Sequence, residues 1–204
     1  MNRPLTDKAY WDDIFLHGRR KLTYPDLDRN RFHIALARLF SRCIPEHSRV
    51  LEVGCGGSLW LPFIMKELRC SVAGIDYSEE GIRKAEKHLR PHGNDYTLHL
   101  MDLQDAAPAL TRRFDVVYSI GVIEHFEDPA GIVAECKKFL KPGGSLITII
   151  PNTAGLLFFL QRLADRAIYE KHATIGLRIL SAATAATDLK YSKPLLSGSS
   201  ISAW

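Results

Sequence analysis

The stretch Val50-Leu-Glu-Val-Gly-Cys-Gly-Gly-Ser-Leu-Trp60 decides the fold, because an apolar run passes directly into a loop with three glycines in four positions. Residues 49–53 have the length and the β-branched content of a buried strand. Glycines at 54, 56 and 57, here called the glycine loop, let the backbone turn tightly and let another group approach it closely. The stretch therefore predicts a strand, a ligand-binding loop and a helix at the carboxyl edge of a parallel sheet.

Strand-like and helix-like segments alternate along the chain, which is typical of α/β folds. Helices are expected at 32–43, at 59–68, after Ser78 and from Pro129 to about residue 140, because each has an apolar stripe or a start signal. The predicted strands are 49–53, 71–76, 96–101, 114–120 and 144–150. The predicted fold class is α/β: a Rossmann-like, doubly wound, mostly parallel sheet with helices on both faces, whose C-terminal strands the sequence leaves incomplete.

The 204 residues are enough for one hydrophobic core, so we expect a single domain over 1–204. Within it we expect an N-terminal lid and helix (1–43), a ligand-binding core (44–152), and a helix with an atypical, truncated C-terminal segment (153–204). Residues 154–169 predict a helix that is apolar at one end, suited to core packing, to roofing a pocket or to peripheral membrane contact. Residues 174–180 alternate like a sixth strand, whereas 196–204 are small and hydroxyl-rich and predict a mobile end without a strand.

Composition argues against several classes of protein. The formal net charge is +4, and the basic residues are spread along the chain, which favours a solvated surface over a nucleic-acid footprint. The four cysteines are widely spaced, with no Cys-x-x-Cys pair, so neither a metal site nor a disulfide framework is indicated. The sequence shows no signal peptide and no run long enough to cross a membrane, and we expect a cytoplasmic protein.

The glycine loop and Asp76 together limit the ligand. The dinucleotide fingerprint would need a glycine at position 59, which is leucine, and no Gly-Lys-Ser/Thr follows the loop, so phosphate-rich ligands are disfavoured. Asp76 ends the second predicted strand, where a carboxylate can accept both hydroxyls of a ribose. Its alternative role is to cap the helix that begins near Ser78. The remaining ligand class has a ribose and no phosphate group.

Five ordered stretches carry a family resemblance. They are Glu52-Val-Gly-Cys-Gly-Gly-Ser58, Gly74-Ile-Asp-Tyr-Ser78, Leu100-Met-Asp-Leu103, the segment from Phe114 to His125, and Leu140-Lys-Pro-Gly-Gly-Ser-Leu-Ile147. Together they resemble the motifs of class I S-adenosylmethionine-dependent methyltransferases, with Ser58 in place of the last glycine of the first motif. The Glu-His-Phe-Glu-Asp-Pro sequence at 124–129 resembles small-molecule methyltransferases, including those of quinone biosynthesis.

The resemblance implies S-adenosylmethionine as the cofactor of the 44–152 core, and a role for each matching residue. Gly54, Cys55 and Gly56 would face the methionine and ribose, and Glu52 would orient the loop. Asp76 would hold the ribose diol, Tyr77 and Leu103 would enclose the adenine, and Asp102 would accept a hydrogen bond from the adenine amine. The backbone at Ser119 and Ile120 would bind the cofactor's ammonium. Trp11 resembles a lid residue of relatives, although it could equally dock the N-terminal segment. An arginine at 29 or 31 is a candidate partner for the cofactor's carboxylate.

The implied reaction is in-line methyl transfer to a small-molecule acceptor, for which the protein mainly supplies alignment and requires no metal. His125 is a candidate general base because its ordinary pKa is near neutrality, with shaping of its loop as the alternative role. An RNA-modifying methyltransferase and a cofactor-binding variant with little turnover stay open as other functions. Nucleic acid is disfavoured, because Ser119-Ile-Gly-Val122 stands where base-methylating enzymes carry Asp/Asn-Pro-Pro-Tyr. The sequence leaves the acceptor, its reacting atom and the oligomeric state undetermined.

Overall fold

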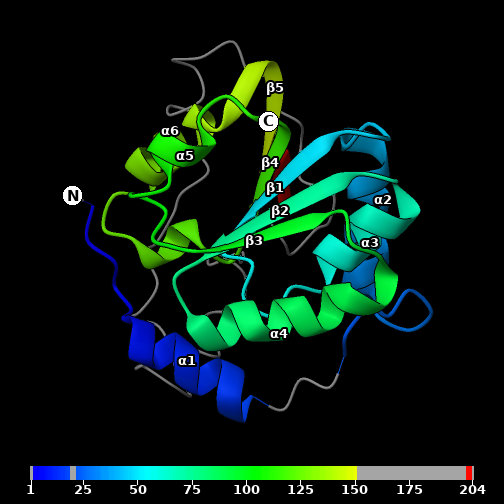
Figure 1. Ribbon diagram of the computed structural model, residues 1–204, viewed down its shortest axis with the longest axis horizontal. Coiled ribbons are helices and arrows are strands. Elements are labelled where there is room, and N and C mark those ends of the chain that lie inside the picture. The colour runs from blue at the N-terminus through cyan, green and yellow to red at the C-terminus, as the bar shows by residue number, and fades with distance from the viewer. Residues whose placement is uncertain (1, 19–21, 151–200, 204) are drawn as a thin grey trace.

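The computed structural model describes residues 2–18, 22–150 and 201–203. The predicted helix at 154–169 and the predicted strand at 174–180 lie outside these residues. Figure 1 shows a twisted central sheet with helices on both sides, as the alternation of segments predicts.

The described sheet has six strands in the order β3-β2-β1-β4-β5-β6. Neighbouring strands are parallel throughout, except that β6 runs antiparallel to β5. The strands are β1 (Arg49–Val53), β2 (Ser71–Asp76), β3 (Tyr96–Leu100), β4 (Phe114–Ile120), β5 (Leu140–Ile149) and β6 (Ile201–Ala203). The strand order reverses between β1 and β4, so the loops that follow these two strands diverge and leave a crevice at the carboxyl edge.

Two layers of helices bury the faces of the sheet (Figure 1). One face is covered by α2 (Arg31–Cys43), α3 (Trp60–Glu67) and α4 (Glu79–Leu89), whose side chains pack with Tyr118 of β4. The other face is covered by α5 (Ala107–Leu110) and α6 (Pro129–Lys138), which pack on Leu51 and Val117. The core is therefore divided by the sheet, and apolar side chains alternate between its two halves.

Three of the four predicted helices begin directly after a residue whose side chain caps them. The hydroxyl of Ser78 accepts a hydrogen bond from the Gly81 N–H at 2.9 Å, and Glu79 and Glu80 occupy the first turn of α4. Asn30 and Asp128 cap α2 and α6 through their side-chain oxygens. Each cap satisfies N–H groups that the helix itself cannot pair, which fixes where the helix begins.

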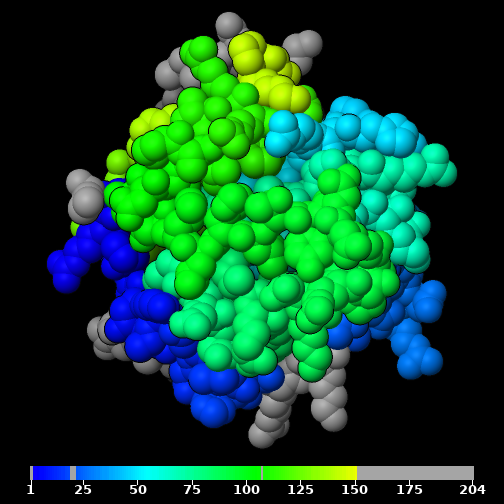
Figure 2. Space-filling model, in the orientation of Figure 1, coloured from blue at the N-terminus to red at the C-terminus, as the bar shows by residue number. Residues whose placement is uncertain are grey.

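The N-terminal segment forms a helix, α1 (Lys8–His17), which the sequence did not predict as a helix. In Figure 1 this blue helix lies beside α4, at the edge of the molecule. It contains no buried residue, but its Asp12 carboxylate accepts a hydrogen bond from the Ser78 hydroxyl at 2.5 Å. The preceding residues reach the turn after β4, where Pro4 bridges to Phe126. In Figure 2 the same blue segment lies against the green surface of α4.

Two strand predictions need correction. The fifth strand begins at Leu140 rather than at residue 144, and the register of β4 against β5 shifts between Phe114 and Val116 to accommodate the Pro-Gly-Gly sequence. The prediction of no strand within 196–204 is wrong for Ile201–Ala203, which pairs antiparallel with residues Ile147 to Ile149. An edge strand of three residues is held by backbone hydrogen bonds, so it does not need an apolar alternation that a sequence pattern would reveal.

Candidate functional site

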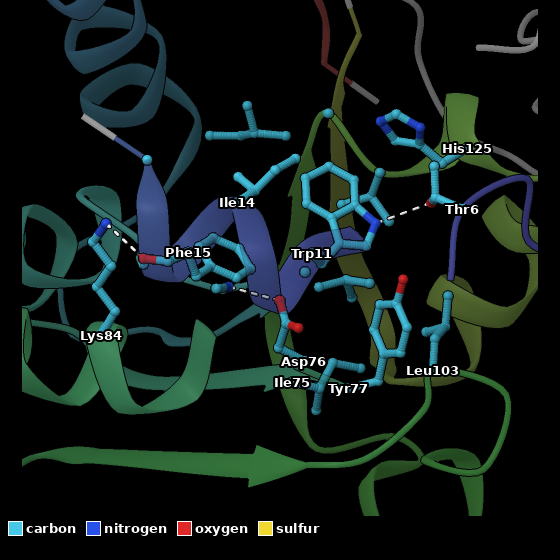
Figure 3. A pocket seen from close by; sticks show the side chains of 18 of the residues that line it. Thr6, Trp11, Ile14, Phe15, Ile75, Asp76, Tyr77, Lys84, Leu103 and His125 are labelled. Atoms are coloured by element: carbon cyan, nitrogen blue, oxygen red, sulfur yellow. Dashed lines mark hydrogen bonds between the residues drawn. The ribbon is translucent and has the colours of Figure 1, made fainter. Parts of the chain in front are cut away.

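A pocket of about 610 Å³ lies at the carboxyl ends of β1, β2 and β4, between the sheet and α1. Figure 3 shows side chains from both sides converging on it. Its walls bring together the glycine loop, Asp76 and Tyr77 after β2, the turn 120–126 after β4, and Trp11, Ile14 and Phe15 of α1. The pocket therefore occupies the crevice that the reversal of strand order creates.

The glycine loop is free of side chains because three neighbours crowd it. Gly54 has a φ of +74°, and a Cβ there would lie 2.4 Å from the side chain of Val122. A Cβ on Gly56 would lie 2.3 Å from the ring of Phe15 and 2.8 Å from the Asp76 carboxylate. Phe15, Val122 and Asp76 are therefore the protein groups that lie closest to this loop.

The Asp76 carboxylate holds the loop in place. One oxygen accepts a hydrogen bond from the Gly56 N–H at 2.7 Å, and the other accepts one from the Ser78 N–H at 2.8 Å (Figure 3 draws the first). Burial raises the pKa of Asp76, while these backbone N–H groups oppose that rise. Asp76 does not itself cap α4, because the N-cap is Ser78; its carboxylate orders the turn just before the helix through the Ser78 N–H. A carboxylate oxygen has more than one acceptor position, so ribose hydroxyls could still be bound.

The residues predicted around an adenine are only partly brought together. Tyr77 and Leu103 both line the pocket, and the Tyr77 hydroxyl donates to the backbone oxygen of Asp7 at 3.3 Å. Asp102 does not line it, and its carboxylate accepts a hydrogen bond from the Gln104 N–H at 2.8 Å instead. Asp102 therefore shapes the turn that presents Leu103.

Three other predicted residues lie beneath the pocket surface. Glu52 is buried and accepts a hydrogen bond from the Tyr118 hydroxyl at 2.8 Å, and burial raises its pKa to about 8. Cys55 is buried with its sulfur toward Gly74, so its side chain does not line the pocket. Ser119 is fully buried, whereas the next residue, Ile120, lines the pocket. Glu52 and Cys55 therefore support the loop from below.

Helix α1 forms the wall opposite the sheet. The Trp11 indole N–H donates to the Thr6 hydroxyl at 2.9 Å, and its ring meets the His125 ring edge to face at 5.1 Å between centroids. Phe15 stacks beside Trp11 and, as Figure 3 shows, lies over the loop near Asp76. Trp11 is thus both a wall of the pocket and a contact that docks the N-terminal segment, while its role as a lid stays a prediction.

Two charged residues line the pocket without having been predicted there. Lys84 of α4 approaches the Phe15 backbone oxygen at 3.5 Å, whereas Arg29 and Arg31 do not line the pocket. Glu124, beside His125 in the short 3₁₀ helix η2 (Ile123–His125), is buried against the pocket wall. The sequence places Lys84 on a solvated helix end and Glu124 in a turn, and neither pattern signals a pocket.

The site fits the cofactor that the resemblance implies. A cavity of about 610 Å³ is in the range of small-molecule sites, and it combines an apolar wall with a carboxylate at the end of β2. Asp76 would hold a ribose, Tyr77 and Leu103 would flank a base, and the loop backbone would face the rest of the molecule. Among the residues that the structure describes, no cluster of three or more His, Cys, Asp or Glu side chains is arranged for a metal ion.

Comparison with known proteins gives a consistent result. Residues 51–148 match the family described as methyltransferase domain. A ubiquinone biosynthesis O-methyltransferase from Thiobacillus denitrificans is 41% identical over 96 residues, which are 47% of this chain and 41% of that protein. The enzyme of the same name from Xanthomonas axonopodis is 33% identical over 127 residues, 62% of this chain and 53% of that protein. The chain thus matches about half the length of these relatives.

Solved structures share the fold at low sequence identity. A SAM-dependent methyltransferase from Archaeoglobus fulgidus aligns with a TM-score of 0.63 at 17% identity, covering 92% of this chain and 78% of that one. A TehB-like SAM-dependent methyltransferase from Corynebacterium glutamicum aligns with a TM-score of 0.60 at 16% identity, covering 96% and 93%. Within the described ranges, no helix is both long enough and apolar enough to span a membrane.

Proposed function

We propose, from the premise that this chain belongs to the class I S-adenosylmethionine-dependent methyltransferases, that it transfers a methyl group to a hydroxyl oxygen of a small, largely apolar acceptor. The observation that supports this most directly is the composition of the pocket. The Asp76 carboxylate and the glycine loop form one side, and the aromatic and aliphatic side chains of α1 form the other. We assign the first side to the cofactor and the second to the acceptor.

The protein's own residues would act by position. Asp76 would bind the ribose, Gly54 and Gly56 would let the backbone approach the sulfonium end, and Trp11 and Phe15 would exclude water from the reacting atoms. The bound cofactor supplies an activated methyl group. Holding the acceptor oxygen in line with that group and away from water is the main contribution that the chain must make.

The choice of a hydroxyl acceptor rests on the relatives, which are named O-methyltransferases. The apolar wall formed by Trp11, Ile14, Phe15 and Phe126 suits a flat, apolar ring that carries such a hydroxyl. We keep the single-domain organisation over 1–204, with its lid (1–43) and core (44–152), as part of the proposal, because α1 completes the pocket of the core.

Calorimetry with S-adenosylhomocysteine and a transfer assay with methyl-labelled S-adenosylmethionine test the proposal. The acceptors are a series of catechols with increasingly apolar substituents, and total RNA. We expect micromolar binding and label in the catechols. Label in RNA would instead indicate a nucleic-acid enzyme, and binding without transfer to any acceptor would indicate a variant without turnover. No binding by a folded sample would exclude the proposal.

A further inference from the structure

The Glu124 carboxyl is the polar group in the described structure that most needs a partner. It is 1% exposed, and neither of its oxygens has a hydrogen-bond partner within the part of the chain that the structure describes. An ionised carboxylate without a partner is costly to bury, so such a group requires an explanation. Asp76 shows the contrast, since both of its oxygens accept backbone hydrogen bonds.

The position of Glu124 links it to the pocket. It lies in η2, one turn after β4, and it lines the pocket together with Gly121, Val122 and His125. Gly121 has a φ of +66°, and a Cβ there would lie 3.6 Å from one of the Glu124 oxygens. The carboxyl therefore lies close behind Gly121, a residue with no side chain of its own to separate the carboxyl from the cavity. Both oxygens are covered in this conformation, so contact with a ligand requires a change of the Glu124 rotamer.

The electrostatic setting suits proton transfer. Burial raises the pKa of Glu124 to about 7, and no charged group among the described residues contributes to that shift. A base whose pKa lies near the working pH is present in its reactive form and can still hold a proton. Within the described part of the chain, the other titratable side chains that line the pocket are Asp76, Tyr77, Lys84, His88 and His125. Of these, His125 was predicted as the base, but its ring packs against Trp11.

We propose that Glu124 is the general base of the methyl transfer, an inference that rests on the proposed function. The Glu124 carboxylate takes the proton of the acceptor hydroxyl as the acceptor oxygen forms its bond to the methyl carbon. The O–H bond breaks, the O–CH₃ bond forms, and the electron pair of the broken C–S bond remains on the sulfur. The proton on Glu124 then passes to solvent, which restores the carboxylate. His125 positions the turn and Trp11.

The first test compares two acceptors in the intact protein. Glu124→Gln keeps the size of the side chain and removes the base. With catechol we expect kcat to fall about 10²- to 10⁴-fold, the usual contribution of a general base. With 4-nitrocatechol, whose acidic hydroxyl is already largely ionised at neutral pH, we expect a fall of less than about tenfold, because that acceptor needs no base. Equal losses with both acceptors, or no loss with catechol, would overturn the proposal.

Two controls distinguish the loss of a general base from a disturbed fold and from a failure of the proposed function. Glu127→Gln makes the same change at an exposed position two residues beyond the 3₁₀ helix, and we expect unaltered kinetics. Binding of S-adenosylhomocysteine to Glu124→Gln should stay within about twofold of the original protein, since Glu124 acts on the acceptor. Transfer by the unaltered protein tests the proposed function by itself. If the unaltered protein transfers the methyl group and Glu124→Gln is equally active, the proposed function stands and only the role of Glu124 as general base is rejected.

A second measurement does not depend on turnover. Carbon-13 NMR of labelled glutamate carboxyls should show one resonance that titrates near pH 7 and disappears in Glu124→Gln. Adding catechol to the complex with S-adenosylhomocysteine should shift this resonance, because the hydroxyl would bond to the carboxylate. A resonance that catechol leaves unchanged would show that Glu124 does not meet the acceptor and would contradict the proposal.

Discussion

Asp76 has two tasks in the proposed site, because it joins the glycine loop to the turn before α4 through the N–H groups of Gly56 and Ser78, and it also faces the pocket. We expect Asp76→Ala to weaken binding of S-adenosylhomocysteine by roughly 10- to 150-fold, which corresponds to about 1.5–3 kcal/mol for losing charge-assisted hydrogen bonds. Calorimetry on a sample shown to be folded measures this. Asp105→Ala removes an exposed carboxylate nearby and should bind normally. Unchanged affinity in Asp76→Ala would mean that the ribose lies elsewhere.

Glu52 should make stability depend on pH. Burial raises its folded-state pKa from 4.5 to about 8, so between these values the folded protein keeps a proton that the unfolded chain has lost. The free energy of unfolding therefore falls as pH rises from about 4.5 to 8, and Glu52 contributes a slope of up to about 1.4 kcal/mol per pH unit. Asp76 and Glu124, whose pKa values are also raised, add to the slope in the same direction.

Glu52→Gln should remove this part of the slope. Urea unfolding at pH 5, 6, 7 and 8 gives the two curves, and the variant's curve should be flatter than that of the unaltered protein. Glu46→Gln, at an exposed position, should follow the unaltered protein. Parallel curves for Glu52→Gln and the unaltered protein would show that Glu52 ionises at its ordinary pKa in the folded state.

At the scale of single residues, the sequence correctly predicts several of the residues that reach the pocket, and these belong to ordered motifs. Gly54, Gly56, Asp76 and Tyr77 all reach the pocket, because each is fixed at the end of a predicted strand. Asp102 does not reach it, since its own turn uses the carboxylate. Glu124 could not be distinguished from an exposed glutamate, because its burial depends on how η2 folds back against β4.

At the scale of elements, α1 should be the least stable part of the pocket wall. It has no buried residue, and elements with few buried contacts open at low free-energy cost. We expect the amides of 11–17 to exchange quickly with solvent deuterium, and to slow by about tenfold or more with saturating S-adenosylhomocysteine, because a ligand held on the glycine loop would also border Phe15 of α1. If the ligand does not change the exchange of these amides, the lid role of α1 is contradicted.

Phe15 should account for much of the protection that the ligand gives to α1, since its ring lies on the glycine loop. In Phe15→Ala the ligand-dependent protection of α1 should be largely lost, as hydrogen exchange would show. Leu16→Ala is the matched control, because Leu16 is 53% exposed on the same helix and should keep the protection. Equal protection in both variants would assign the docking of α1 to its other contacts.

The elements that the sequence missed have weak patterns for physical reasons. In α1, aromatic and aliphatic residues from Tyr10 to Leu16 do not form one buried stripe, because the helix covers a pocket rather than a core. In β5, the Pro-Gly-Gly sequence predicts a break, but the strand continues through it with a shifted register. By contrast, β1, β2 and β4 lie where predicted, since their residues are buried by both helical layers.

At the scale of the whole molecule, β6 covers the outer edge of β5 among the described strands. Deleting residues 201–204 should expose backbone groups of β5, and uncovered edges favour pairing between molecules. We expect faster amide exchange at Ile147 to Ile149 and concentration-dependent association in sedimentation velocity. Ile201→Thr keeps the backbone of the strand and should remain unassociated. Unchanged exchange in the deletion variant would show that the pairing contributes little.

The topology of the whole was predictable because parallel α/β units constrain one another. Once β1 and β2 are placed beside each other, the glycine loop and Asp76 must meet at one edge, and the return to β4 creates the crevice. The antiparallel addition of β6 was not predictable in this way. The strand has only three residues, too few for an alternating pattern to stand out in the sequence, and it pairs with β5 through backbone hydrogen bonds at the edge of the sheet.

Exchange of cofactor in this protein would pass beneath α1, whose Trp11 and Phe15 form the wall facing the glycine loop. Each catalytic cycle would then include the release of the used cofactor and the binding of a fresh one, and both steps would require α1 to move away from its few contacts. Lid movements of this kind commonly limit the rates of enzymes that perform fast chemistry. The turnover number would therefore follow the viscosity of the solvent, and a tighter hold by α1 would lengthen the residence of the spent cofactor.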